Sequence, residues 1–147
     1  MRNLLKLMSS VVLVSWMTLL VLPVAKAHSD ATYQFVIESG TLTHLRQQLI
    51  LAPQTLEVKT GEVGQVGVLV LGEETARDQI YVFVDLLTTT FYFAERATTP
   101  SEIMREARRY GGILRASADR FDRPEGHSAH VNTRNTRLVV NAKRVHE

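Results

Sequence analysis

The sequence predicts a small single α+β domain, in which a few-stranded antiparallel sheet packs against one long helix or a helix pair. Three observations lead to this fold class. β-Rich runs bounded by turn residues recur in the first half of the chain, beginning with Tyr33–Glu38. Thr99-Pro100-Ser101-Glu102 has the residue types of a helix start. Residues 28–147 are numerous enough to bury one hydrophobic core.

The first 27 residues are typical of a secretory signal peptide. Two basic residues precede a charge-free run over Leu7–Val24, and Ala25-Lys26-Ala27 offers a small-x-small cleavage site. We therefore predict cleavage after Ala27 and a periplasmic or secreted domain over residues 28–147. A retained signal anchor is the alternative, because the apolar run approaches the ~20 residues that span a bilayer.

The amino-acid composition excludes several kinds of chemistry and shows an uneven distribution of charge. The chain has no cysteine, which excludes disulfides, a lipoprotein anchor, thiol catalysis, iron–sulfur clusters and covalent haem. Residues 28–103 carry 4 basic and 10 acidic residues, a balance of −6, whereas residues 104–147 carry 10 and 5, a balance of +5. Such asymmetry favours docking on a charged partner, or an attraction between the two halves of the domain.

The first half of the domain shows mainly β-strand signals. Tyr33–Glu38 is predicted to be a strand that ends at Ser39-Gly40. Thr41–Leu51 is ambiguous, because its leucines lie at helical spacing. Residues 55–72 are predicted to form a hairpin that turns at Thr60-Gly61-Glu62.

Residues 76–97 give conflicting signals. Their β-branched and aromatic composition favours a strand. Their apolar residues nevertheless recur at the helical intervals i, i+3, i+4, i+7 and i+11 from Ile80 to Phe91, and Thr75 with Asp78 resembles a capping box. We expect a helix, with a strand as the alternative.

The following segment is predicted to be a helix over residues 100–121, with Pro100 in its first turn. Gly111-Gly112 in its middle indicates either a kink or the close approach of another backbone. We expect a loop over residues 122–130 and a final strand over Thr136–Val145.

The basic last third supplies the candidate partner-binding residues. The arginine side chains of this region could form a docking surface for another protein, and the same groups suit a phosphate, an acidic glycan or an anionic lipid head group. Phe91-Tyr92-Phe93 cannot bury all three rings on one face of a helix, so one or two of the rings must meet another element or a partner. The residues proposed for docking are Arg105, Arg108, Arg109, Arg115 and Tyr92.

The histidines suggest a metal site as an alternative. Cleavage after Ala27 would make His28 the N-terminal residue, whose α-amine and imidazole together suit Cu(II). His127 and His130 could complete the ligand set. This arrangement resembles the N-terminal histidine of copper-binding periplasmic proteins and of copper oxygenases. Zinc is not expected, because it needs at least three protein ligands and no second pair has suitable spacing.

Known catalytic motifs are missing from the sequence, which contains neither Gly-x-Ser-x-Gly nor His-Glu-x-x-His. The leading hypothesis is therefore a small exported, non-enzymatic protein that acts as an adaptor in a bacterial envelope assembly such as a secretion, pilus or transfer apparatus. Its expected partner is another envelope protein or a second copy of itself, and no nucleic acid is expected. A copper-binding protein and an enzyme with an unrecognised site are the alternatives.

Overall fold

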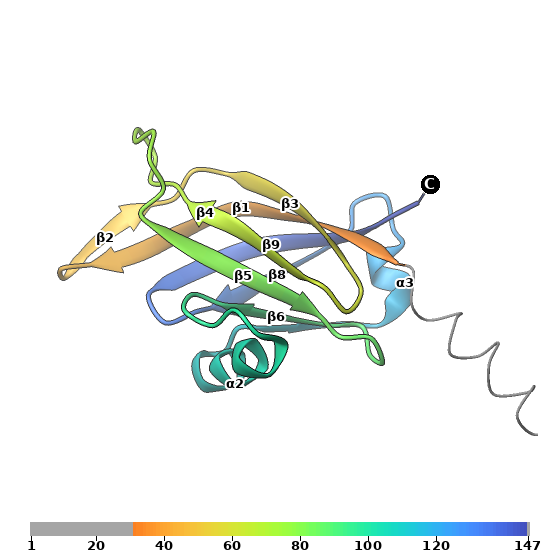
Figure 1. Ribbon diagram of the computed structural model, residues 1–147. Coiled ribbons are helices and arrows are strands. Elements are labelled where there is room, and N and C mark those ends of the chain that lie inside the picture. Colours follow the sequence, from red (N-terminus) through yellow and green to blue (C-terminus); the bar gives the residue numbers. More distant parts are fainter. Residues whose placement is uncertain (1–30, 147) are drawn as a thin grey trace, which may run out of the picture. The chain divides into compact units, whose positions relative to one another are not determined.

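The computed structural model describes residues 31–146, of which 53% lie in strands and 13% in helices. Two antiparallel sheets face each other across a common core (Figure 1). The predicted signal peptide lies outside the described residues. The elements in chain order are β1 Thr32–His44, β2 Gln47–Ile50, β3 Gln54–Lys59, β4 Val63–Val68, β5 Asp78–Val84, β6 Thr90–Ala94, α2 Pro100–Tyr110, β7 Ile113–Arg115, α3 Ala118–Phe121, β8 His127–Asn132 and β9 Thr136–Val145.

The first sheet, called here the β1 sheet, has the order β2-β1-β9-β8. Strand β1 is long enough to pair with three strands. Along one edge its first half pairs with β3 and its second half with β2, while β9 runs along its other edge. A bulge between Ile37 and Ser39 shifts the register with β9. The β1 sheet thus joins both ends of the described chain.

The second sheet, called here the β6 sheet, has the order β4-β5-β6-β7. The two sheets meet at an isolated bridge between Leu51 and Val70. The inner faces of the two sheets bury a contiguous apolar core. Its largest fully buried side chains include Phe35 from β1 and Phe91 and Phe93 from β6, whose rings pack edge to face at 4.9–5.8 Å.

Helix α2 covers the outer face of the β6 sheet (Figure 1). Ile103 and Ala107 project from one side of the helix and are fully buried against that face. Beneath them lie the outward residues of the sheet, among them Phe83 and Tyr92, which stack on each other. The domain therefore has three layers over β6: the β1 sheet, the β6 sheet and α2.

The predicted fold class is wrong in its helices. No long helix or helix pair covers one sheet in the described part of the chain; two sheets cover each other, and α2 has 11 residues. The helix expected over 76–97 is instead the pair of strands β5 and β6. All five residues of β6 are buried, because the core lies on one side of the strand and α2 on the other. Burial on both faces removed the alternation that marks a strand.

The helix expected over 100–121 ends at Tyr110. Gly111 adopts a left-handed conformation (φ 86°) and caps the helix, and its N–H donates to the Ala107 carbonyl at 2.9 Å. Gly112 then lies so close to the Phe93 and Asn132 carbonyls that a Cβ atom would clash. The glycine pair thus marks the end of the helix, followed by the close approach of another backbone. Of the two structures expected at this pair, the close approach is confirmed and the kink within a longer helix is wrong.

Three other expectations have mixed outcomes. The final strand over Thr136–Val145 is confirmed as β9. Residues 127–130, expected in a loop, begin strand β8. The two strands expected in the 55–72 hairpin exist as β3 and β4, but they pair in different sheets, β3 with β1 and β4 with β5.

Candidate functional site

The candidate site lies along one flank of α2, where the end of β6 and the turn between β8 and β9 meet the helix. Thr99 precedes the helix in an extended conformation and Pro100 occupies its first turn, as the sequence predicts, although the Thr99 side chain makes no capping hydrogen bond. The burial of Ile103 and Ala107 fixes the rotation of the helix about its axis. This rotation turns Glu106 and Tyr110 toward the β8–β9 turn.

Two glutamates hold the walls of the site together. Glu106 on α2 accepts hydrogen bonds from the backbone N–H groups of Glu95 (2.8 Å) and Arg96 (3.3 Å), which ties the helix to the end of β6. The carboxylate of Glu95 is itself buried, with 2% exposure. It accepts hydrogen bonds from the Thr133 hydroxyl, from the Asn135 N–H at 2.8 Å and from the Asn135 side-chain amide at 2.9 Å. These contacts attach the β8–β9 turn of one sheet to β6 of the other.

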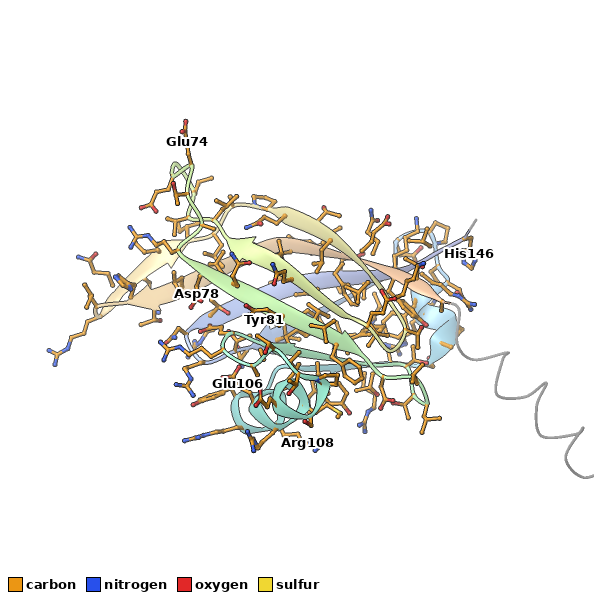
Figure 2. All side chains as sticks on the ribbon, viewed as in Figure 1. Glu74, Asp78, Tyr81, Glu106, Arg108 and His146 are labelled. Atoms are coloured by element: carbon orange, nitrogen blue, oxygen red, sulfur yellow. The ribbon has the colours of Figure 1, made fainter. Side chains whose placement is uncertain are left out.

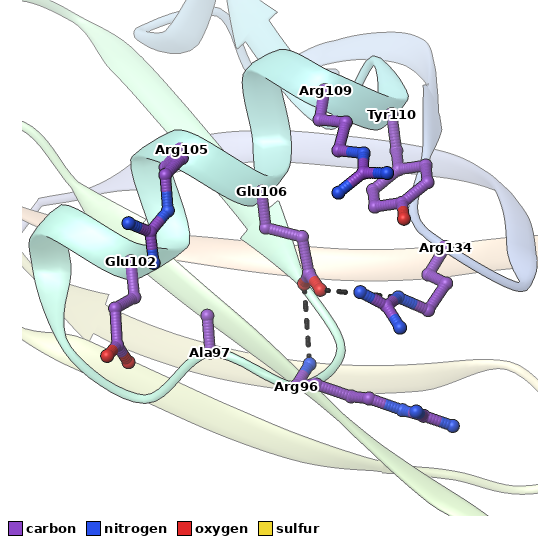
Figure 3. A pocket seen from close by; sticks show the side chains of 8 residues that line it. All are labelled: Arg96, Ala97, Glu102, Arg105, Glu106, Arg109, Tyr110 and Arg134. Atoms are coloured by element: carbon purple, nitrogen blue, oxygen red, sulfur yellow. Dashed lines mark hydrogen bonds and ion pairs between the residues drawn. The ribbon is translucent and has the colours of Figure 1, made fainter.

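The three segments enclose a hollow of about 440 Å³ that is open to solvent (Figure 3). This volume lies within the ~300–1,000 Å³ of small-molecule pockets. We call it the arginine pocket, and it is lined by Arg96, Ala97, Glu102, Arg105, Glu106, Arg109, Tyr110 and Arg134. Four of its eight residues are arginines, which makes it suited to anions.

Tyr110 organises two of these arginines. The guanidinium carbons of Arg109 and Arg134 lie 5.4 and 5.5 Å from the centre of the Tyr110 ring, within the range of cation–π attraction. Arg134 also approaches Glu106, with 3.7 Å between Nε and Oε1. The aromatic ring therefore holds two positive charges at the wall of the pocket (Figure 3).

Three arginines of the pocket contrast with a fully paired arginine elsewhere in the domain. Arg77 holds both carboxylate oxygens of Glu73, with distances of 2.6 and 2.8 Å. This hydrogen bonding lowers the pKa of Glu73 and raises the pKa of Arg77. Within residues 31–146, by contrast, no carboxylate oxygen lies within 4.0 Å of the guanidinium nitrogens of Arg96, Arg105 or Arg109.

The structure divides the five proposed partner-binding residues between two flanks of α2. Arg105 and Arg109 line the arginine pocket. Arg108 leaves α2 on a different side from Glu106 (Figure 2), and its guanidinium lies 5.9 Å from the centre of the Tyr92 ring. Tyr92 is 4% exposed, so it can contribute to a surface only by supporting Arg108. Arg115 is exposed on β7 and donates a hydrogen bond to the Thr90 hydroxyl at 3.3 Å.

The candidate metal ligands are not brought together in the part of the chain that the structure describes. His127 and His130 are three residues apart on strand β8, so their side chains project from opposite faces of the sheet. His127 packs edge to face on Phe121 of the core. His28 lies outside residues 31–146, and within them no three histidine, aspartate or glutamate side chains gather as metal ligands. The copper site stays a prediction.

Sequence reasoning missed Arg96 and Arg134 as site residues. Arg96 lies two residues beyond the end of β6, in a segment expected to be helical, and Arg134 lies in the turn between β8 and β9, 25 positions beyond Arg109. No local pattern links either of them to α2. They reach the pocket only through tertiary contacts, namely the hydrogen bonds of Glu95 and Glu106 that join the three segments.

Comparison of the chain with protein-family models, with curated proteins and with solved structures finds no match. Among residues 31–146, no helix combines the length and the hydropathy needed to cross a membrane. The geometry of the arginine pocket and of α2 is therefore the basis for a functional proposal.

Proposed function

We propose that the chain is an exported, non-enzymatic adaptor that docks on an acidic envelope protein through the outward side of α2. The docking surface consists of Arg105, Arg108 and Arg109 on the helix and Arg115 on the same face of the β6 sheet. The observation that carries the proposal is that the three helix arginines are exposed and that none has a carboxylate partner within residues 31–146.

Physical chemistry supports an interface role for this arrangement. Arginine is enriched in protein interfaces, because its planar fork binds carboxylates with two hydrogen bonds and its weak hydration makes burial less costly. Tyr92 holds Arg108 from below, which reduces the conformational freedom that docking would remove. The excess of basic residues in the last third of the sequence adds electrostatic steering toward an acidic surface.

The test is chemical crosslinking in the native cell envelope, followed by purification of the tagged protein. We expect Arg108→Glu/Arg109→Glu to lose the crosslinked partner while keeping the wild-type melting temperature. The matched control is Arg120→Glu/Arg123→Glu, which changes net charge equally at exposed positions of α3 and the loop after it. Retention of the partner by the first variant would reject the surface. Equal loss in both variants would show that only overall charge matters, and would reject it as well.

A further inference from the structure

The arginine pocket carries more positive charge than its own carboxylates balance. Four arginines stand against Glu102 and Glu106, which leaves an excess of two positive charges. Glu106 is already engaged by two backbone N–H groups and by Arg134. Arginines kept close together in an open hollow repel one another, so a bound anion would lower the free energy of the site.

The geometry restricts the kind of anion. Arg109 and Arg134 both contact the ring of Tyr110 and both line the pocket, so two guanidinium forks border the same hollow. Each fork can donate two parallel hydrogen bonds to adjacent oxygens of one group. A single carboxylate has two oxygens and one charge, whereas a phosphomonoester has three terminal oxygens and about −1.5 to −2 charges at pH 7. The phosphomonoester therefore matches both the excess charge and the number of donors.

We propose that the arginine pocket binds a dianionic phosphoryl group, held by Arg109 and Arg134 with Arg105 as a third cation. This activity goes beyond docking on a protein. Arg105 and Arg109 belong to both the docking surface and the pocket, whereas Arg108 belongs to the docking surface alone and Arg134 to the pocket alone. Arg108 and Arg109 are adjacent, exposed and on the same helix. They form a matched pair of positions for testing phosphate binding, and Arg134, which lines the pocket but lies outside the docking surface, separates phosphate binding from docking.

The experiment is a calorimetric titration of the purified full chain, as processed by a bacterial host, with inorganic phosphate at low ionic strength. We expect saturable binding of one phosphate. Arg109→Gln is expected to weaken it about tenfold, the usual effect of removing a charge-assisted hydrogen bond, while Arg108→Gln leaves it unchanged. Arg134→Gln should act like Arg109→Gln; because Arg134 also contacts Glu106, its melting temperature is measured alongside.

Two further titrations, with acetate and with an Asp/Glu-rich peptide, distinguish a phosphoryl site from a general anion site. The proposal expects weaker binding of both at the pocket. It is overturned if phosphate binds without saturation, if Arg108→Gln and Arg109→Gln weaken binding equally, or if the peptide binds more tightly than phosphate in an Arg109-dependent way. The last result would instead make the pocket part of the protein-docking surface. An unchanged envelope crosslink alongside lost phosphate binding in Arg134→Gln would separate the two functions.

Vesicles identify the source of the phosphoryl group. Phosphatidylcholine vesicles with and without phosphatidic acid are sedimented with the protein. Arg109-dependent binding that requires phosphatidic acid supports the proposal with a lipid head group as the source. Phosphate binding without vesicle binding supports it with a soluble phosphomonoester. Absence of both phosphate and vesicle binding overturns it.

Discussion

Strands β6 and β9 are both internal strands of their sheets, yet their burial differs. In β9 the inward residues Thr136, Leu138, Val140 and Ala142 are buried, and the residues between them are not. In β6 every residue is buried. The difference arises from α2, which covers the outer face of the β6 sheet, whereas no helix lies over the outer face of the β1 sheet within residues 31–146. A covering helix turns the second face of a strand into core.

The interface between α2 and the outer face of the β6 sheet is thus a second, smaller hydrophobic core. Tyr92 and Ala94 would be surface residues on a bare sheet, but here they are 4% and 0% exposed beneath the helix. The equivalent outward residue of β9, Val139, is only partly buried. Substitutions at the outer faces of the two sheets should therefore have different costs.

The largest expected effect is at Ile103, which is fully buried between α2 and the β6 sheet. Ile103→Ala should lower the free energy of unfolding by about 2–5 kcal/mol, because it removes buried methyl groups and leaves a cavity. Val139→Ala, on the outer face of the β1 sheet, should lower the free energy of unfolding by less than about 1 kcal/mol. Urea unfolding of both variants measures the difference. Equal losses would show that α2 adds no core to this face.

The same contrast explains how much of the fold could be predicted. Strand β9 was predicted with its observed bounds because one exposed face keeps the period of two visible in the sequence. The segment of β5 and β6 resembles a helix in the sequence, because burial on both faces replaces the period of two with a nearly continuous apolar run whose gaps match helical spacing. The start of α2 at Pro100 was predictable from local residue chemistry, which does not depend on tertiary contacts.

The candidate site was predictable only in the part that lies on α2. Arg105 and Arg109 belong to one helix, and their spacing places them on one flank. Arg96 and Arg134 reach the same pocket through the contacts of Glu106 and Glu95 with other segments. Glu95 follows a run of aromatic residues and shows no sequence sign of burial. Residues that are placed by tertiary contacts of this kind show no periodic pattern in the sequence by which they could be predicted.

A smaller effect is expected from Glu95, which connects the β6 sheet to the β8–β9 turn of the β1 sheet. Glu95→Ala would leave the backbone and side-chain N–H donors of Asn135 without their acceptor and would remove one of the two hydrogen-bond partners of the Thr133 hydroxyl. Because an unsatisfied buried polar group costs about 1–3 kcal/mol, we expect a loss of about 2–3 kcal/mol in urea unfolding. The control Glu57→Ala, exposed on β3, should change stability by less than about 0.5 kcal/mol. A loss of the same small size at both positions would contradict a connecting role for Glu95.

The smallest effect on stability, and the only stabilising one, is expected at the tip of the β1–β2 hairpin in the β1 sheet. Leu45 and Arg46 form its two-residue turn with φ of 47° and 64°, a left-handed conformation that costs about 1 kcal/mol for residues other than glycine and asparagine. Leu45 is 84% exposed, so its replacement loses no apolar contact that would offset the relief of strain. Leu45→Asn/Arg46→Gly should therefore raise the free energy of unfolding by about 1 kcal/mol.

The matched control for this variant is Leu71→Asn, which removes another exposed leucine (62%) from a residue without a positive φ. It should change stability by less than about 0.5 kcal/mol. A gain in the hairpin variant alone would assign the effect to the backbone of the turn, since loss of an exposed leucine is common to both variants. Equal changes would mean that the left-handed turn carries no strain.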